Sequence, residues 1–183
     1  MSSPRSPGGL TLLIGGARSG KSSFAVEVGL AQHGDVTFIA TATALDDDMA
    51  QRIARHRAER PDWLTIEEPM LLGDALGTVP DSHMVIIDCL TLWVTNLMLA
   101  DTPYDEMLAA AQSGAQRAAV RTSTTIVITN EVGLGVHPPT ALGRRYQDLL
   151  GQVNQIWARA ARRTLFMSAG RAVALGDPWK EFA

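Results

Sequence analysis

The sequence predicts an α/β protein with a mainly parallel sheet that is covered by helices on both faces. Short, uniformly apolar runs alternate with longer amphipathic segments along its 183 residues, a pattern typical of strands buried between two helical layers. A glycine-rich loop joins the first apolar run to the first amphipathic segment. In such sheets ligands bind beyond the carboxyl ends of the strands. We therefore expect one catalytic domain over residues 10–183, preceded by a disordered lead-in at residues 1–9.

The predicted strands are the apolar runs that end at glycine, proline or polar residues. They cover residues 10–14, 36–40, 63–66, 84–88, 125–129 and 164–167. The predicted helices follow the apolar spacing of an amphipathic helix. They cover residues 22–32, 46–60, 70–76, 90–99, 104–121 and 140–162. The last segment, residues 173–183, fits either a short hairpin arm or a tail.

Composition excludes several classes of partner. The net charge of -3 gives no global basic surface for nucleic acid or anionic lipid. No apolar run approaches the roughly 18–20 residues that span a bilayer. The single cysteine, Cys89, excludes an internal disulfide and fits a reducing compartment. We expect a cytoplasmic protein with no nucleic-acid partner and no membrane span, in which local groups hold any phosphate-bearing ligand.

The glycine-rich loop has the pattern G-x-x-x-x-G-K-S of a P-loop. It reads Gly15-Gly16-Ala17-Arg18-Ser19-Gly20-Lys21-Ser22. Glycines let backbone N–H groups surround phosphate oxygens, Lys21 reaches the β- and γ-phosphates, and Ser22 offers a hydroxyl to Mg²⁺. The alternative is a glycine turn with an exposed lysine, but the strand before and the helix after favour the P-loop. Arg18 either contacts a terminal phosphate or is solvated.

A second acid completes the expected magnesium site. Asp88 ends an apolar strand, where P-loop proteins place the carboxylate that organises Mg²⁺. Alternatively, Asp88 caps the following helix by accepting its first N–H groups. The acidic run Asp46-Asp47-Asp48 competes for this role, and we interpret it mainly as a charged first helical turn. We therefore expect Ser22 and Asp88 to hold the ion, directly or through water.

The predicted helix over residues 46–60 carries a histidine among arginines. His56 lies one turn after Arg52 and one turn before Arg60, so the three can share a face. Neighbouring cations favour the neutral, nucleophilic imidazole and can also hold a triphosphate, which suits covalent catalysis or phosphate recognition. The spacing also fits a solvated helix with one surface histidine. On spacing alone this simpler interpretation is preferred.

The P-loop alone leaves the reaction open, because kinases, NTPases and GTPases share it. No Asn-Lys-x-Asp run is present to recognise guanine, and Thr129-Asn130-Glu131-Val132 has neither the lysine nor the aspartate. Residues 129–139 are either an ordered loop that offers a substrate or subunit surface, or an ordinary loop. Two alternative functions are a kinase with a single activity and a binding protein switched by nucleotide hydrolysis.

Taken together, the motifs resemble those of the bifunctional adenosylcobinamide kinase / adenosylcobinamide-phosphate guanylyltransferase family of cobalamin biosynthesis. The resemblance runs from residue 10 to about residue 168. Its motifs are the P-loop; Ile39-Ala40-Thr41-Ala42; Asp47-Asp48-Met49 with Arg52-Ile53 and His56-Arg57; Trp63 through Glu68-Pro69; Asp88-Cys89-Leu90-Thr91 with Thr95-Asn96-Leu97; Thr129-Asn130-Glu131-Val132-Gly133; and Gly151-Gln152-Val153-Asn154-Gln155.

This resemblance implies two reactions. The γ-phosphate of ATP or GTP passes to the aminopropanol hydroxyl of adenosylcobinamide, and GMP then passes from GTP, through a guanylyl-histidine, to the phosphorylated product. The family's histidine matches His56, which reverses the preference drawn from spacing. Further implied nucleotide contacts are Ala40, Thr41, Ala42, Arg57, Ala58, Glu59, Arg60, Glu68 and Asp88. The resemblance also implies a RecA-like fold and a homotrimer.

Overall fold

A computed structural model describes residues 8–44, 47–58 and 60–181. Its strands form one seven-stranded sheet in the order β3-β2-β4-β5-β1-β6-β7. Every neighbouring pair is parallel except β6 and β7, which are antiparallel. The strands are β1 (Gly9–Gly15), β2 (Val36–Ala40), β3 (Leu64–Glu67), β4 (Met84–Asp88), β5 (Thr124–Asn130), β6 (Arg163–Ser168) and β7 (Arg171–Leu175). The mainly parallel sheet predicted from the apolar runs is confirmed.

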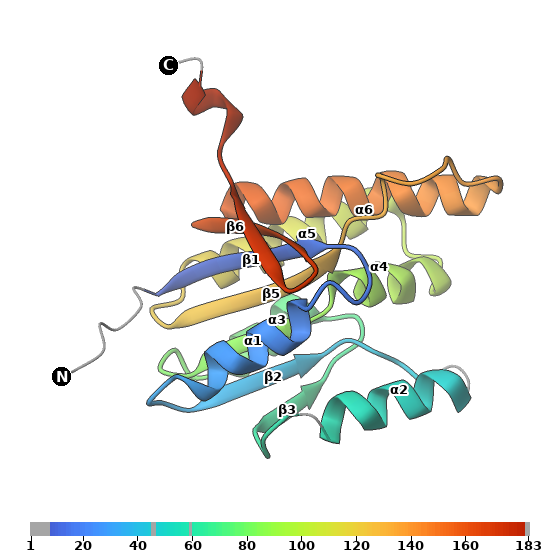
Figure 1. Ribbon diagram of the computed structural model, residues 1–183. Helices are drawn as coiled ribbons and strands as arrows, with labels where there is room; N and C mark the ends of the chain where they lie inside the picture. The colour runs from blue at the N-terminus through green and yellow to red at the C-terminus, as the bar shows by residue number, and fades with distance from the viewer. Residues whose placement is uncertain (1–7, 45–46, 59, 182–183) are drawn as a thin grey trace.

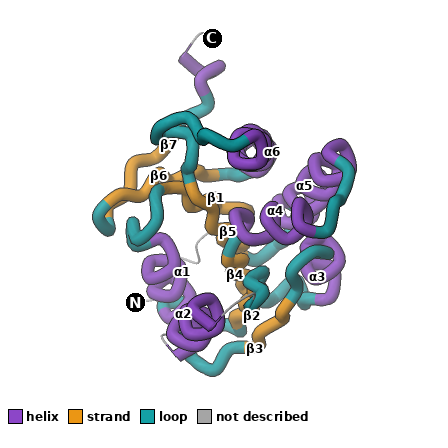
Figure 2. Tube along the Cα trace, turned by 90° about the vertical axis from the view of Figure 1, so that its right-hand side faces the viewer, coloured by secondary structure: helices purple, strands orange, loops and turns teal. Residues whose placement is uncertain are grey.

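Helices cover both faces of this sheet (Figures 1 and 2). They are α1 (Lys21–Leu30), α2 (Asp47–Ala58), α3 (Leu72–Thr78), α4 (Leu90–Leu99), α5 (Tyr104–Ala119) and α6 (Ala141–Ala160), followed by the 3-10 helix η1 (Pro178–Glu181). Helices α3 to α6 enclose the larger apolar core with one face, and α1 packs on the smaller core of the other face. Figure 2 shows α1 and α2 on the side of the sheet opposite α3, α4 and α5.

The apolar runs form strands because both of their faces are buried. Leu12 and Leu13 follow each other in β1, and both side chains are fully buried, one in each core. Strand β1 also pairs with β5 on one edge and with β6 on the other. The loop that follows β1 therefore starts from the fully buried interior of the sheet.

The predicted boundaries agree with the structure to within two residues, and at the end of the second helix this small difference changes the expected site. Helix α2 stops at Ala58, and Arg60 lies outside it. Pro61 follows Arg60, and the residue before a proline is disfavoured in helical geometry. The expected helical face shared by His56 and Arg60 is therefore wrong.

The structure tests the predictions for the two ends of the chain in part. Strand β1 begins at Gly9, so that residue belongs to the sheet rather than to the lead-in. Residues 1–7 lie outside the described part of the chain. Near the C-terminus, β7 pairs with β6 as a hairpin arm, which was one of the two alternatives for this segment.

The parallel arrangement brings the carboxyl ends of β1, β2 and β4 to one edge of the sheet. Gly15, Ala40 and Asp88 are the last residues of these three strands. The P-loop and α2 lie at this same end of the molecule (Figure 1). Within the described ranges, no helix is long and apolar enough to cross a membrane.

Candidate functional site

Two glycines let the P-loop lie close against neighbouring backbone. A Cβ atom on Gly15 would lie 2.2 Å from the carbonyl oxygen of Met167 in β6. Gly20 has φ 96°, a left-handed conformation that glycine adopts without strain, and it directly precedes α1. Gly16, Ala17 and Arg18 are exposed. The loop thus rests on buried backbone and opens to solvent at its crest.

Lys21 lies inside this loop and is only 6% exposed. Its ammonium group donates to the carbonyl oxygens of Gly15, at 2.9 Å, and Gly16, at 2.6 Å, and to Ser19 Oγ at 3.1 Å. Burial lowers the pKa of Lys21, an effect opposed by the charge of Asp88. A glycine turn with an exposed lysine, the alternative to a P-loop, does not describe this geometry.

The expected magnesium pair is in contact. Ser22 Oγ donates to Asp88 Oδ2 at 2.9 Å, which joins the start of α1 to the end of β4. Burial raises the pKa of Asp88, while the hydrogen bond from Ser22 and the nearby charges of His56, Lys21 and Arg60 lower it. The residue preceding α4 is Cys89, and no side-chain cap is made there. This arrangement favours the metal-site interpretation of Asp88 over the helix cap.

A cavity of about 260 Å³ opens beside this pair. We call it the Ser22 cavity; it is lined by Ser22, Ser23, Val26, Glu27, Phe38, His56, Arg60 and Asp88. His56 itself is exposed, near the end of α2. The structure therefore brings the predicted nucleophile, Ser22 and Asp88 together around one space.

Arg60 is placed at the Ser22 cavity by a contact that the sequence did not indicate. Its guanidinium carbon lies 3.9 Å from the centroid of the Phe38 ring, a cation–π contact. The contact joins the segment after α2 to strand β2. Arg60 and His56 thus meet at one cavity although they do not share a helical face.

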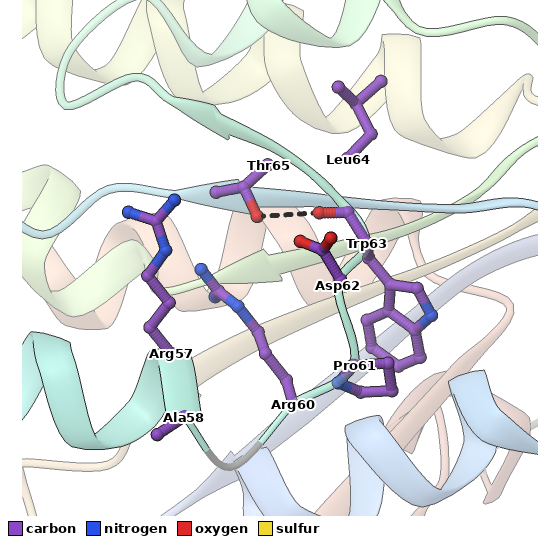
Figure 3. A pocket seen from close by; sticks show the side chains of 8 residues that line it. All are labelled: Arg57, Ala58, Arg60, Pro61, Asp62, Trp63, Leu64 and Thr65. Atoms are coloured by element: carbon purple, nitrogen blue, oxygen red, sulfur yellow. Dashed lines mark hydrogen bonds between the residues drawn. The ribbon is translucent and has the colours of Figure 1, made fainter.

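A second, larger pocket of about 500 Å³ adjoins the first and shares Arg60 with it. We call it the β3 pocket; it is lined by Arg57, Ala58, Arg60, Pro61, Asp62, Trp63, Leu64 and Thr65. Figure 3 shows Arg57 and Trp63 on opposite sides of the pocket, with Arg60 between them. The pocket combines cations, a carboxylate, a hydroxyl and an indole. Of the four predicted contacts at residues 57–60, three line it, and Glu59 lies outside the described residues.

Thr41, another predicted nucleotide contact, is fully buried and its hydroxyl is used inside the protein. Its Oγ1 donates to the carbonyl oxygen of Cys89 at 2.7 Å and accepts from the N–H of Cys89 at 2.8 Å. The threonine thereby fixes the end of β2 to the end of β4. Among the described residues lining the two pockets, neither Ala40, Thr41 nor Ala42 occurs.

Glu68, the remaining predicted contact, also has internal partners. One carboxylate oxygen accepts from the N–H groups of Met70, at 2.9 Å, and Leu71, at 2.8 Å. Its own N–H donates to the carbonyl oxygen of Ala40 at 2.9 Å. Glu68 thus shapes the turn from β3 toward α3 at the same edge of the sheet.

The connection between β5 and α6 is an ordered loop. Glu131 N–H donates to the carbonyl oxygen of Gly15 at 3.2 Å, so the loop begins against the P-loop. Gln147 donates to Val132, and Arg144 donates to Pro138 and Pro139, all at 3.0 Å. Two of its apolar side chains remain exposed, Leu134 at 79% and Val136 at 95%. The loop is held in place while presenting apolar groups to solvent.

The tip of the β6–β7 hairpin is a neighbour of the P-loop that sequence reasoning missed. Gly170 N–H donates to the carbonyl oxygen of Ser19 at 2.9 Å. The two residues are far apart in sequence, and no motif marks their contact. The Ala169-Gly170 pair between two apolar runs is the one local signal, because glycine in such a position indicates a tight hairpin.

Comparison with protein families gives one match over most of the chain. The family described as cobinamide kinase / cobinamide phosphate guanyltransferase matches residues 11–175. The bifunctional adenosylcobalamin biosynthesis protein CobP of Pseudomonas aeruginosa is 40% identical over 170 residues, covering 91% of this chain and 98% of that protein. The corresponding CobU of Escherichia coli K12 is 34% identical over 180 residues, covering 91% of this chain and 99% of that protein.

Solved structures of low sequence identity share the fold. The RadB recombinase superposes with a TM-score of 0.50 at 17% identity, covering 88% of this chain and 75% of that one. A prototypical ATPase from a bacterial type III secretion system gives a TM-score of 0.60 at 10% identity, covering 92% of this chain and 57% of that one. These likenesses confirm the expected P-loop NTPase fold.

Proposed function

The chain belongs to the cobinamide kinase / cobinamide phosphate guanyltransferase family, and we propose that both reactions take place at the Ser22 cavity, the second through His56. The observation that carries the proposal is that His56 lines the same cavity as Ser22 and Asp88, which are themselves hydrogen-bonded. The proposed nucleophile and the last residue of the phosphate-binding loop thus lie at one cavity.

In the kinase reaction, the aminopropanol hydroxyl of adenosylcobinamide attacks the γ-phosphorus of a nucleoside triphosphate. A bond forms between that oxygen and the phosphorus, the bond to the β,γ-bridging oxygen breaks, and the nucleoside diphosphate and the hydroxyl proton leave. The protein's part is positioning and neutralising charge. Lys21 and the backbone of Gly15–Gly20 would hold the non-transferred phosphates.

In the guanylyl transfer, an unprotonated ring nitrogen of His56 attacks the α-phosphorus of GTP. The phosphorus–nitrogen bond forms as the bond to the α,β-bridging oxygen breaks, and pyrophosphate leaves. A phosphate oxygen of adenosylcobinamide phosphate then attacks the same phosphorus, the phosphorus–nitrogen bond breaks, and adenosylcobinamide-GDP forms. One difficult displacement is thus divided into two easier ones.

We propose that Ser22 and Asp88 hold Mg²⁺ with the bound triphosphate. Their hydroxyl and carboxylate oxygens are adjacent and of the kind that this ion prefers. No group of three or more His, Cys, Asp or Glu residues in the described chain could hold a metal alone, which fits an ion shared with phosphates. When bound, the ion neutralises charge that develops on the phosphate oxygens.

We propose that the β3 pocket receives the guanine of GTP during guanylyl transfer. The pocket adjoins the Ser22 cavity through Arg60. Its volume suits a nucleobase and ribose. Asp62 and Thr65 can pair with base edges, and the ring of Trp63 offers an apolar surface.

We also propose a homotrimer that acts in the cytoplasm. The family resemblance supports the trimer, as do the exposed apolar side chains of Leu134 and Val136. The free, buried Cys89 fits a reducing compartment. Analytical ultracentrifugation of the full chain tests the trimer, which a purely monomeric species would exclude.

A product assay tests the function itself. Purified protein is incubated with adenosylcobinamide, Mg²⁺ and either ATP alone or ATP followed by GTP. The masses of the corrinoid products are then measured by mass spectrometry. We expect a phosphate adduct with ATP and a GDP adduct after GTP. Phosphorylation without any GDP adduct would indicate a kinase with a single activity, and triphosphate hydrolysis without either adduct would indicate a nucleotide-driven switch.

A further inference from the structure

The two edges of the sheet differ in how they are protected. An edge strand presents unpaired backbone N–H and C=O groups, which proteins usually protect with charges, proline or a covering element. Strand β3, at one edge, has four residues and ends at Glu67, whose carboxylate lies 3.7 Å from the guanidinium of Arg57 in α2. Strand β7, at the other edge, has five residues and a charge only at its start. Its sequence is Arg171-Ala172-Val173-Ala174-Leu175. The edge formed by β7 therefore lacks the usual protection.

Strand β7 is mostly apolar and yet exposed on both faces. All five of its residues are exposed, and its two larger apolar side chains, Val173 and Leu175, are 64% and 49% exposed. Trp179, in the following helix η1, is 79% exposed. In the described part of the chain β7 pairs only with β6, and Figure 2 shows β7 at the end of the sheet. Neighbouring exposed apolar groups of this kind indicate a surface that another protein chain covers.

The hairpin turn determines which backbone groups of β7 point outward. Ser168 and Arg171 are paired across a two-residue turn, and both residues of that turn have positive φ. In such a hairpin the pair next to the turn exchanges both of its hydrogen bonds, and the pattern then alternates along the strand. The odd-numbered residues of β7 therefore bond to β6. The even-numbered residues, Ala172 and Ala174, direct their N–H and C=O groups outward, where a further strand can bind them.

Strand β7 and the two residues after it are complementary to themselves in one antiparallel register. Centring two copies on Ala174 places Arg171 of each copy opposite Asp177 of the other. The same register places Val173 opposite Leu175. Opposite charges and paired apolar side chains both stabilise neighbouring strands. Within the described ranges Arg171 makes no ion pair, so its charge is available for this contact. Ala174 then faces its own counterpart as a hydrogen-bonded pair, as its outward N–H and C=O groups require.

We propose that β7 is the surface at which two copies of this chain associate, as an antiparallel strand pair centred on Ala174. The pair joins two sheets into one continuous sheet and covers apolar side chains of β7 at the joint. Moving the centre by one residue in either direction places an apolar residue opposite Arg171 and loses the charge contact. Within the described residues Asp177 uses one carboxylate oxygen, which accepts from the N–H of Trp179 at 3.1 Å. Its other oxygen remains for Arg171.

The proposed pair has two-fold symmetry and uses a different surface from the proposed trimer, which is supported by the loop between β5 and α6. A chain that forms both assemblies becomes a hexamer, in which three β7 pairs join two trimers. A strand pair of this length buries less surface than a standard protein interface, so we expect it to be weak and to dissociate on dilution. The inference concerns assembly and is independent of the two proposed reactions.

Sedimentation of the full chain over a concentration series tests whether copies associate in pairs. We expect the mass of the assembly to double, from trimer to hexamer, as the protein concentration rises from the micromolar to the submillimolar range. If the trimer proposal fails, the doubling runs from monomer to dimer, so the two proposals fail separately. A species that remains a monomer or a trimer at the highest concentration would overturn the β7 pair.

A charge exchange tests the register. Arg171→Asp and Asp177→Arg each place like charges opposite each other at two points of the symmetric pair, so each should raise the Kd of the pair by about tenfold. The double variant restores opposite charges, and its Kd should return to within about threefold of the wild-type value. The same sedimentation series measures all three variants. Single variants that associate like the wild type, or a double variant that does not recover, would contradict the register.

Disulfide trapping tests the same register with two variants of one strand, and the native Cys89 is buried. Ala174→Cys places two sulfur atoms opposite each other, on Cα atoms about 5.5 Å apart, which a disulfide spans. Ala172→Cys, at an equally oriented alanine, places them about 13 Å apart along the strands, which is too far. Under mild oxidation we expect Ala174→Cys to form the covalent dimer at least about tenfold faster than Ala172→Cys. Equal rates, or faster trapping of Ala172→Cys, would overturn the proposal.

Discussion

The P-loop and helix α2 carry the two halves of the proposed chemistry, and they are built differently. The P-loop continues from a buried central strand, and its Lys21 is 6% exposed with three hydrogen-bond acceptors around it. Helix α2 is largely exposed along its length, including His56. The proposed triphosphate-binding residues are therefore anchored in the core, whereas the proposed nucleophile lies on an exposed helix. Changes near the P-loop should affect both reactions, and changes in α2 should affect one.

The largest effect is expected at the P-loop lysine. Lys21→Ala removes the cation that neutralises phosphate charge, so kcat/KM should fall by about 100-fold or more in both the kinase and the guanylyl reaction. Both rates are measured on the same preparation, with Lys180→Ala, at the exposed second lysine, as the control. A loss confined to one reaction would contradict the proposal that both reactions use the same phosphate-binding loop.

A smaller effect is expected at Asp88, where function and stability should oppose each other. Asp88→Asn removes the charge that holds Mg²⁺, and we expect a loss of about 100-fold or less in both reactions. Since burial raises the pKa of Asp88, the folded state favours its neutral form. The stability from that neutral form is present at low pH and is lost as the pH rises through the raised pKa.

Two measurements follow for Asp88. The free energy of unfolding at neutral pH, from urea titration, should be higher for Asp88→Asn than for the wild type. Kinase activity of the wild type should decline, as the pH falls, at a higher pH than an ordinary aspartate would give, because protonation removes the metal-binding charge. A destabilised Asp88→Asn variant would show that the carboxylate serves the fold rather than the metal.

The smallest effect on the two reaction rates, together with a measurable loss of folding stability, is expected at Asn154, which contacts β5 next to the P-loop strand β1. Asn154 of α6 is buried; it accepts from Thr129 Oγ1 at 2.7 Å and donates to the carbonyl oxygen of Asn130 at 3.1 Å. Asn154→Ala leaves both partners without these bonds, so urea titration should show a loss of about 2 kcal/mol. Gln155→Ala, at the exposed neighbour, should change stability by less than about 0.5 kcal/mol.

The same contrast explains what the sequence could predict. Strand β1, the P-loop and the position of Asp88 at the end of β4 each depend on a short run of contiguous residues. The local sequence pattern therefore predicted them to within one or two residues. The role of His56 was suggested by family resemblance and not by spacing, since an exposed helix with a histidine has no distinctive pattern. His56 and Arg60 were expected to lie close together, and both line the Ser22 cavity. They do so without sharing a helical face, because α2 ends at Ala58 and the guanidinium of Arg60 packs on the Phe38 ring.

Contacts between distant segments were beyond local pattern. Thr41 and Glu68 are predicted to contact the nucleotide, and the sequence did not indicate the hydrogen bonds that their side chains make within the protein at that edge. Nothing in the sequence relates Gly170 to Ser19, because their contact depends on β6 pairing beside β1. The strand order had to be known before the hairpin tip could be placed against the P-loop.

The most direct test of the account is the position of covalent GMP on the protein. Wild-type protein is incubated with α-labelled GTP and Mg²⁺, denatured and digested, and the labelled residue is identified by mass spectrometry. We expect an acid-labile, alkali-stable label on His56, absent from His56→Ala and retained by His137→Ala, a control at another exposed histidine. A label on another residue, or an undiminished label in His56→Ala, would contradict the proposal that α2 brings the nucleophile to the P-loop.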